Sequence, residues 1–253
     1  MQVALSNVFG PLKDHPSKAT PRAGDHLGVI EIRHEPGAGG AVRLGGRELA
    51  QWLPWHFDHC YNDELNRAGV LRAVEIPPDG GRTGFVDGIA LYHAVAPEIR
   101  NRIEGETVKY AMDVIMSNLR YGRPAGFEVV KENETASNVM DEYAGRPLAL
   151  HPAVWTRATG EKVLHVSPWM AKGVVGKDDD EADALLMEVG GAILTAAEDL
   201  SYFHRWEPDH MVIWDNWRVL HAVSGMPPEH PRCMHRTTIK GDYGLGRFET
   251  AGV

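Results

Sequence analysis

The chain has 253 residues, a net charge of −9, a hydrophobic fraction of 43% and a charged fraction of 24%. These values are ordinary for a globular protein, and the length suffices for one domain, residues 1–253, with a sizeable core. The negative charge argues against a nucleic-acid surface, and no apolar run is long enough to span a bilayer. Two distant cysteines, Cys60 and Cys233, and the lack of a signal-peptide pattern lead us to expect a cytoplasmic protein.

The first half of the chain predicts short strands and two helices. Residues 1–9 predict an amphipathic helix that ends at Gly10 and Pro11. The segments that follow predict, in order, a strand (26–35), a glycine-rich loop (36–46), a strand (67–78), a turn and strand (79–87), and a helix ending on Gly105 (88–105). Residues 107–116 suit a strand or a helix.

The second half continues the same pattern. It predicts an irregular excursion (117–146), a hairpin (151–168), a long helix with acidic residues in its first turn (177–207), and strands over 210–224 and 232–243. Many short strands with few helices, and no regular strand–helix repeat, favour a mainly β barrel or sandwich with flanking helices.

The stretch "WHFDHCYNDE", residues 55–64, contains a candidate metal pair. His56 and Asp58 are two residues apart, so on a strand both side chains face one way. With a distant histidine they would form the two-histidine, one-carboxylate triad of non-haem Fe(II) oxygenases. The pair alone is weak evidence in a chain with 13 histidines. A capped turn with a surface aspartate explains it equally well.

The C-terminal segment strengthens the metal hypothesis. A predicted strand ends at His221, and Arg232 and Arg236 follow on one face of the next predicted strand. Arginine offers a planar fork of donors that matches a carboxylate. An oxygenase that uses 2-oxoglutarate needs such a cation for the far carboxylate of that co-substrate, and the second arginine could meet an anionic substrate.

Four ordered blocks of the chain resemble the taurine dioxygenase and 2,4-dichlorophenoxyacetate dioxygenase (TauD/TfdA) family of Fe(II)- and 2-oxoglutarate-dependent enzymes. The blocks are "WHFD", "GGRTGFVD", "HPAVWTRATGEKVLHVSP", and the pair "IWDNWRVLHAV" and "RCMHRTTIKGD". The resemblance covers residues 50–242. It implies a double-stranded β-helix (jelly-roll) barrel and a reaction in which 2-oxoglutarate and O2 yield succinate, CO2 and a hydroxylated substrate, or one cleaved after hydroxylation. Relative to this family, the N-terminal part is shorter than usual.

The resemblance also implies a role for each matching residue. His56, Asp58 and His221 would hold Fe(II), while Thr83 and Arg232 would bind 2-oxoglutarate. The substrate would meet three residues: Arg236 through its anionic group, Met170 where relatives place an aromatic, and Trp52 where sulfonate-using relatives place a polar amide. An apolar residue in that last place makes taurine itself an unexpected substrate and favours a small, partly apolar organic anion.

Two other functions remain open from the residues alone. One is a barrel that binds a small acid without catalysis, and the other is a zinc-dependent hydrolase on a cupin-like barrel with the same three ligands. The zinc hydrolase leaves Thr83 and Arg232 without a role. The resemblance leaves a homo-oligomer open, and it gives no reason to expect His59 or His235 to be ligands.

Overall fold

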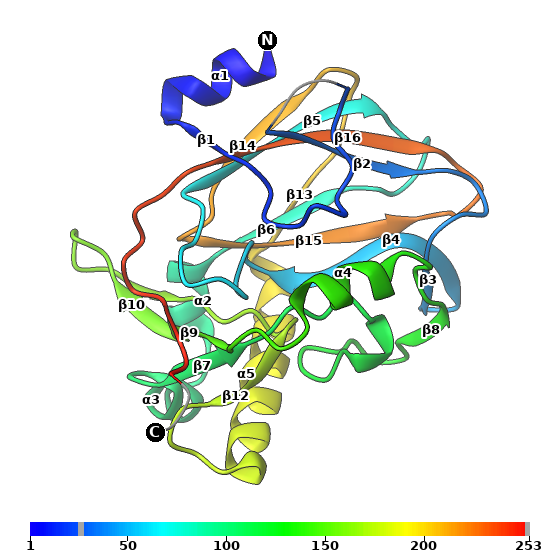
Figure 1. The fold of residues 1–253 in the computed structure, drawn as a ribbon. Helices are drawn as coiled ribbons and strands as arrows, with labels where there is room; N and C mark the ends of the chain where they lie inside the picture. The colour runs from blue at the N-terminus through cyan, green and yellow to red at the C-terminus, as the bar shows by residue number, and fades with distance from the viewer. Residues whose placement is uncertain (25–27, 251–253) are drawn as a thin grey trace.

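The structure is a computed structural model that describes residues 1–24 and 28–250. Two antiparallel sheets lie face to face and form the body of the fold (Figure 1). The first has the strand order β1 (Leu12–Lys13), β16 (Arg232–Ile239), β5 (Ala68–Glu75) and β14 (Met211–Asp215), with β2 (Val29–His34) also paired to β16. The second has the order β13 (Tyr202–His204), β6 (Thr83–Asp87), β15 (Val219–Met226), β4 (Arg47–His56), β3 (Ala41–Leu44) and β8 (Glu128–Lys131).

Smaller elements flank this body, most of them beyond the second sheet (Figure 1). They comprise a further sheet of β12 (Ala171–Val174), β7 (Thr107–Tyr110), β9 (Ala149–Pro152) and β17 (Arg247–Phe248), and a hairpin of β10 (Val154–Thr156) and β11 (Lys162–Leu164). The helices are α2 (Gly88–Ala94), α3 (Pro97–Ile103), α4 (Ala136–Tyr143) and α5 (Asp179–Leu200), with a 3-10 turn at Met116–Asn118.

The first helix, α1 (Gln2–Phe9), lies on the outside of the first sheet. The Gln2 side chain donates hydrogen bonds to the backbone oxygens of Val70 on β5 and His235 on β16. The Ser6 hydroxyl lies 2.6 Å from that of Thr237. This helix therefore ends where Gly10 and Pro11 predicted and covers the back of the strand that carries Arg232 and Arg236.

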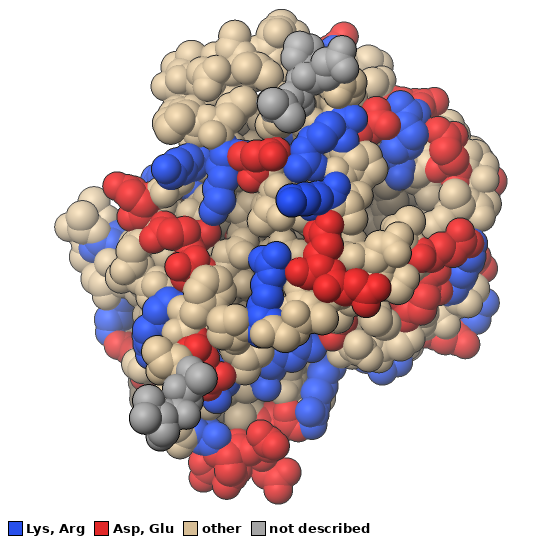
Figure 2. Space-filling view, in the orientation of Figure 1, with Lys and Arg blue, Asp and Glu red and all other residues tan. Residues whose placement is uncertain are grey.

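The main hydrophobic core lies between the second sheet and the flanking elements. Helix α5 contributes Leu185, Leu186, Val189 and Ile193 to it, all buried. Among the described residues no helix is both long and apolar enough to cross a membrane. Figure 2 shows both acidic and basic side chains on the face it presents.

Several predicted elements differ in detail from the structure. The helix predicted over 88–105 is two helices, because Pro97 lacks a backbone N–H and starts a new helix as its first residue. The predicted loop 36–46 contains β3, and the excursion 117–146 contains β8 and α4. The long helix ends at Leu200, and strand β13 follows. Of the strand predicted over 26–35, positions 26 and 27 lie outside the described residues.

Candidate metal centre

A proline-induced bulge at the end of β4 positions His56. Leu53 pairs with Val223 and His56 with His221, so β4 uses one residue more than β15 over this interval. Pro54 lies in the interval, and a proline inside a sheet is confined to edges and bulges because it cannot donate to the ladder. The freed carbonyl of Pro54 accepts a hydrogen bond of 2.7 Å from His56 Nδ1. This bond fixes the proton on Nδ1 and leaves the Nε2 lone pair available for a metal.

His221 and Asp58 complete a compact, buried set of ligand atoms with His56. His221 lies directly across the ladder from His56, with ring centroids 4.1 Å apart. Its Nε2 is 3.6 Å from Asp58 Oδ1, and one ligand atom from each of the three residues lies within 4.8 Å of the others. Trp169 and Trp214 pack against the His56 and His221 rings at centroid distances of 5.0 and 5.1 Å.

The electrostatics keep His56 and Asp58 in their metal-binding protonation states. Burial, together with the neighbouring His221, lowers the pKa of His56 to about 3, so this imidazole is neutral near pH 7. Burial alone would raise the pKa of Asp58, but the Arg236 guanidinium and His221 outweigh it and hold this pKa well below its usual range. A neutral imidazole beside a carboxylate is the donor set that a divalent metal requires.

Asn216 anchors the segment that carries Asp58. Its Oδ1 accepts a hydrogen bond from the Asp58 backbone N–H at 2.8 Å, and its Nδ2 donates to the Asp58 carbonyl at 3.1 Å. The same amide nitrogen contacts the backbone and side-chain oxygens of Asn66. The sequence analysis did not single out this residue, although it stands in the "WDNW" block. The adjacent Asp215 instead pairs with Arg67 nearer the surface.

Arg236 reaches the centre from the opposite sheet. Its Nη1 donates to Asp58 Oδ1 at 2.9 Å, and its Nη2 lies 2.6 Å from Oδ2. The pair is buried and bidentate. The resemblance assigns Arg236 to the substrate, but here Arg236 binds Asp58, a candidate metal ligand. Its Nε is buried and has no hydrogen-bond partner among the described residues.

Arg232, also on β16, is a buried cation whose donors are incompletely used. It is 3% exposed, and burial lowers its pKa to about 10. Nη1 donates to Gln51 Oε1 at 2.9 Å, whereas Nε and Nη2 have no partner among the described residues. Buried charged donors without partners are costly, and a carboxylate would satisfy both. The residues therefore fit a carboxylate ligand at this point.

Thr83 lies on β6, buried, two residues before Phe85, which pairs with His221 across the ladder. Its hydroxyl accepts a hydrogen bond of 3.2 Å from Trp206 Nε1, which leaves its own proton free to be donated.

A cavity of about 250 Å³ adjoins the centre. Trp52, Leu53 and Trp169 line it, and Trp169 also packs on the ring of His56. Gln51, the partner of Arg232, belongs to the same lining. Met170, in contrast, has its Sδ 3.8 Å from Cys60 Sγ. Trp169, next to Met170, is therefore the residue between the cavity and the candidate ligands. It was not among the predicted site residues.

His59 is a buried polar residue beside the centre. It has a φ of 61°, and neither ring nitrogen has a hydrogen-bond partner among the described residues. His15 packs near it with ring centroids 5.5 Å apart. Two other histidines from the sequence have structural partners: His151 contacts the Asn62 carbonyl, and His165 contacts that of Asn216.

The chain is similar to known proteins in sequence and in fold. The model of the taurine catabolism dioxygenase TauD, TfdA family matches residues 1–238. Pentalenolactone F synthase of Streptomyces arenae is 28% identical over 197 residues, which cover 74% of this chain and 61% of the synthase. The 2,4-dichlorophenoxyacetate dioxygenase of Cupriavidus pinatubonensis, named as α-ketoglutarate-dependent, is 28% identical over 251 residues, covering 95% and 80%.

The chain spans about three fifths of the length of the pentalenolactone F synthases that it matches, 61% and 60% for two Streptomyces enzymes. A crystal structure of a taurine dioxygenase from Burkholderia xenovorans superposes with a TM-score of 0.66 at 22% identity, covering 98% of this chain and 77% of that one. This likeness confirms the predicted fold, a mainly β jelly-roll with flanking helices.

Proposed function

The chain belongs to the taurine catabolism dioxygenase TauD, TfdA family, and on this basis we propose that it is an Fe(II)- and 2-oxoglutarate-dependent dioxygenase. The observation that carries the proposal is the buried set of His56, Asp58 and His221 beside a buried arginine with unused donors. A barrel that only binds an acid has no need of three metal ligands, and a zinc hydrolase has no need of Arg232.

His56, Asp58 and His221 would hold the metal, with Nε2 of His56 selected by the Pro54 contact. When bound, Fe(II) together with 2-oxoglutarate and O2 supplies the oxidising power to hydroxylate a C–H bond, with succinate and CO2 as co-products. The protein contributes a dry, preorganised set of ligands. Trp169 and Trp214 exclude water from the imidazole rings that they cover.

Arg232 and Thr83 would bind the far carboxylate of 2-oxoglutarate. The Nε and Nη2 donors of Arg232 form a fork that suits two carboxylate oxygens, while Gln51 holds Nη1 and so orients the guanidinium. The Thr83 hydroxyl would donate a further hydrogen bond, since Trp206 already uses it as an acceptor.

For the substrate we propose a small, partly apolar organic anion. Trp52 and Trp169 give the cavity two aromatic walls, which suit an apolar body. Arg236 keeps an unused Nε for an anionic group while its terminal nitrogens hold Asp58. Trp169 is better placed than Met170 as the substrate contact of its segment, because it lines the cavity and Met170 packs on Cys60. Relatives named for phenoxypropionate and 2,4-dichlorophenoxyacetate act on acids of this kind.

The test is anaerobic addition of Fe(II) and then 2-oxoglutarate to metal-free protein, followed by visible absorption. We expect a weak metal-to-ligand charge-transfer band that His221→Ala abolishes and Arg232→Ala weakens. Arg72→Ala is the matched control, since Arg72 lies on neighbouring β5 and pairs with Asp209 at the surface. If folded, iron-loaded protein gives no band, the co-substrate does not bind the metal, and the zinc or binding-barrel alternative takes precedence.

A further inference from the structure

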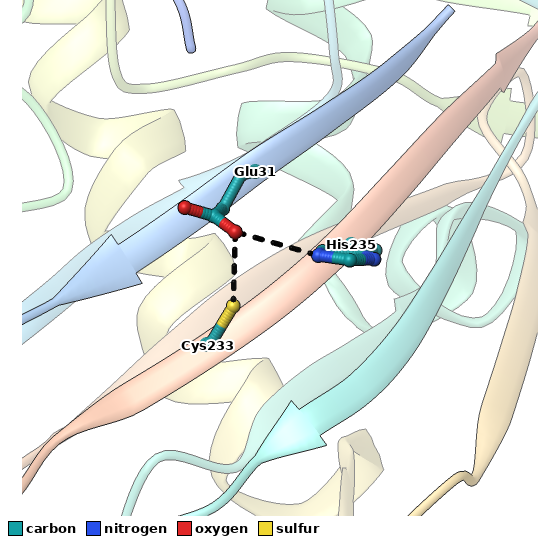
Figure 3. Close-up of side chains that lie close together, drawn as sticks. All are labelled: Glu31, Cys233 and His235. Atoms are coloured by element: carbon teal, nitrogen blue, oxygen red, sulfur yellow. Dashed lines mark hydrogen bonds and ion pairs between the residues drawn. The ribbon is translucent and has the colours of Figure 1, made fainter. Parts of the chain in front are cut away.

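A second cluster of metal-ligating side chains lies on the outer face of the first sheet. It consists of Glu31 on β2 with Cys233 and His235 on β16 (Figure 3). Cys233 and His235 are two residues apart and share one face of their strand, and Glu31 is the ladder partner of His235. Arg232 and Arg236 alternate with them and point the other way, into the barrel. The two faces of β16 thus carry two separate sets of functional groups.

The spacing of the three ligand atoms suits a tetrahedral metal ion. Glu31 Oε2 lies 3.5 Å from His235 Nε2 and 3.6 Å from Cys233 Sγ. Around a tetrahedral zinc ion with usual bond lengths, an oxygen and a nitrogen are about 3.4 Å apart, and an oxygen and a sulfur about 3.6 Å apart. Both separations from Glu31 therefore match such a tetrahedron, and all three ligand atoms lie within 4.8 Å of one another.

The surroundings favour a divalent cation. Besides His235, Arg33 pairs with Glu31, at 3.0 Å through Oε1 and at 3.4 Å through Oε2. The same guanidinium also contacts Glu35 at 3.2 Å and Glu75 at 3.5 Å. Three carboxylates against one arginine leave a local excess of two negative charges. Glu35 and Glu75 can keep Arg33 in place when Glu31 turns one oxygen to a metal.

The cluster is accessible and chemically specific. The side chains of His235 and Glu31 are 23% and 26% exposed, so an ion can reach them from solvent, while Cys233 lies beneath them. A thiolate, an imidazole and a carboxylate together select zinc-type ions over magnesium or calcium, which prefer oxygen ligands alone. Fe(II) at the inner centre meets no sulfur ligand, so the two sites differ in chemistry.

We propose that Glu31, Cys233 and His235 form a second metal site that binds Zn²⁺, with its fourth position open to water. The ion would link β2 to β16 on the outer face of the sheet, opposite the side chains of Arg232 and Arg236. Occupancy would therefore stabilise the strand on which both arginines stand. The proposal does not depend on the function assigned to the inner centre.

The test is a titration of metal-free protein with Co(II), a spectroscopic substitute for zinc. We expect the sulfur-to-cobalt charge-transfer absorption in the near ultraviolet together with the intense visible bands of tetrahedral cobalt. Cys233→Ser should abolish the charge-transfer band. Cys60→Ser is the matched control, since Cys60 is the other buried free cysteine. His221→Ala should also keep the band, because only the inner centre loses a ligand.

Two further variants keep the proposal testable if Cys233→Ser fails to fold. Glu31→Gln and His235→Asn change surface-accessible ligands, and each should weaken Co(II) binding at this site by about tenfold or more. Added Zn²⁺ should raise the melting temperature of the wild-type protein more than that of either variant. A band that disappears in His221→Ala, survives in Cys233→Ser, or never forms in folded wild-type protein would overturn the proposal.

Discussion

Asn216 anchors the Asp58 segment of the candidate metal centre. It is fully buried and holds both the N–H and the carbonyl of Asp58, while its own backbone oxygen contacts His165 Nε2. The segment after β4 has no strand partner at this point, so these hydrogen bonds substitute for a ladder. Partners of metal ligands commonly matter almost as much as the ligands themselves.

We predict that Asn216→Ala lowers metal affinity about 10- to 100-fold. The free energy of unfolding should fall by about 1–3 kcal/mol, because the Asp58 N–H is left buried and unpaired. Metal titration and urea unfolding of the metal-free protein measure the two effects. Asn118→Ala is the control: Asn118 bonds Asp113 at an exposed position, and its loss should leave metal affinity unchanged. Unchanged affinity in Asn216→Ala would refute the anchoring role.

The sequence could predict the ligands of the candidate centre but not the contacts that hold them. His56 and Asp58 are close in the chain, and His221 and the arginines stand in recognisable blocks, so spacing together with the family resemblance suggested them. The pairing of Arg236 with Asp58 depends on two sheets meeting face to face, which no local pattern encodes. His59 adopts a left-handed φ of 61°, and that conformation puts a polar ring where strand alternation does not predict it.

For helix α5, the local sequence pattern predicts the helix itself, whereas a tertiary contact determines how it packs. Its acidic first turn and Asp178 cap made the helix predictable, since the Asp178 side chain accepts from the Glu181 N–H. Its packing depends on Gly190, where the helix approaches the backbone of Gly122. A Cβ at Gly190 would lie 2.6 Å from the Gly122 nitrogen. The adjacent Gly191 has open space around it and is exposed.

These two glycines predict opposite effects of the same substitution. Gly191→Ala should stabilise the protein by up to about 1 kcal/mol, because alanine is the better helix former. Gly190→Ala should destabilise it, because the new methyl group meets backbone that cannot move aside cheaply. Thermal unfolding of the two variants beside the wild type measures both signs. An equal gain in both would show that α5 does not pack closely on the Gly122 segment.

Histidine burial couples the stability of the whole molecule to pH. Burial lowers the pKa of His56 and His165 to about 3 and that of His151 to about 4. An unfolded chain protonates each of them near pH 6.5. Below about pH 6.5 the unfolded chain therefore binds protons that the folded state does not bind. The free energy of unfolding falls as the pH drops through this range. The ionised Asp58 carboxylate also contributes to the free energy of unfolding. Because its pKa is depressed, this contribution is lost only under strongly acid conditions.

We predict that the metal-free protein loses stability steadily between pH 7 and pH 5, by about 1 kcal/mol per pH unit for each histidine whose pKa burial depresses. Urea unfolding at a series of pH values measures the slope. His165→Gln should make the slope shallower by about 1 kcal/mol per pH unit, because this ring bonds a backbone oxygen and stacks on Phe57 and is not a candidate metal ligand. Equal stability at pH 7 and pH 5 would mean that these rings accept protons in the folded state, and hence that water reaches them.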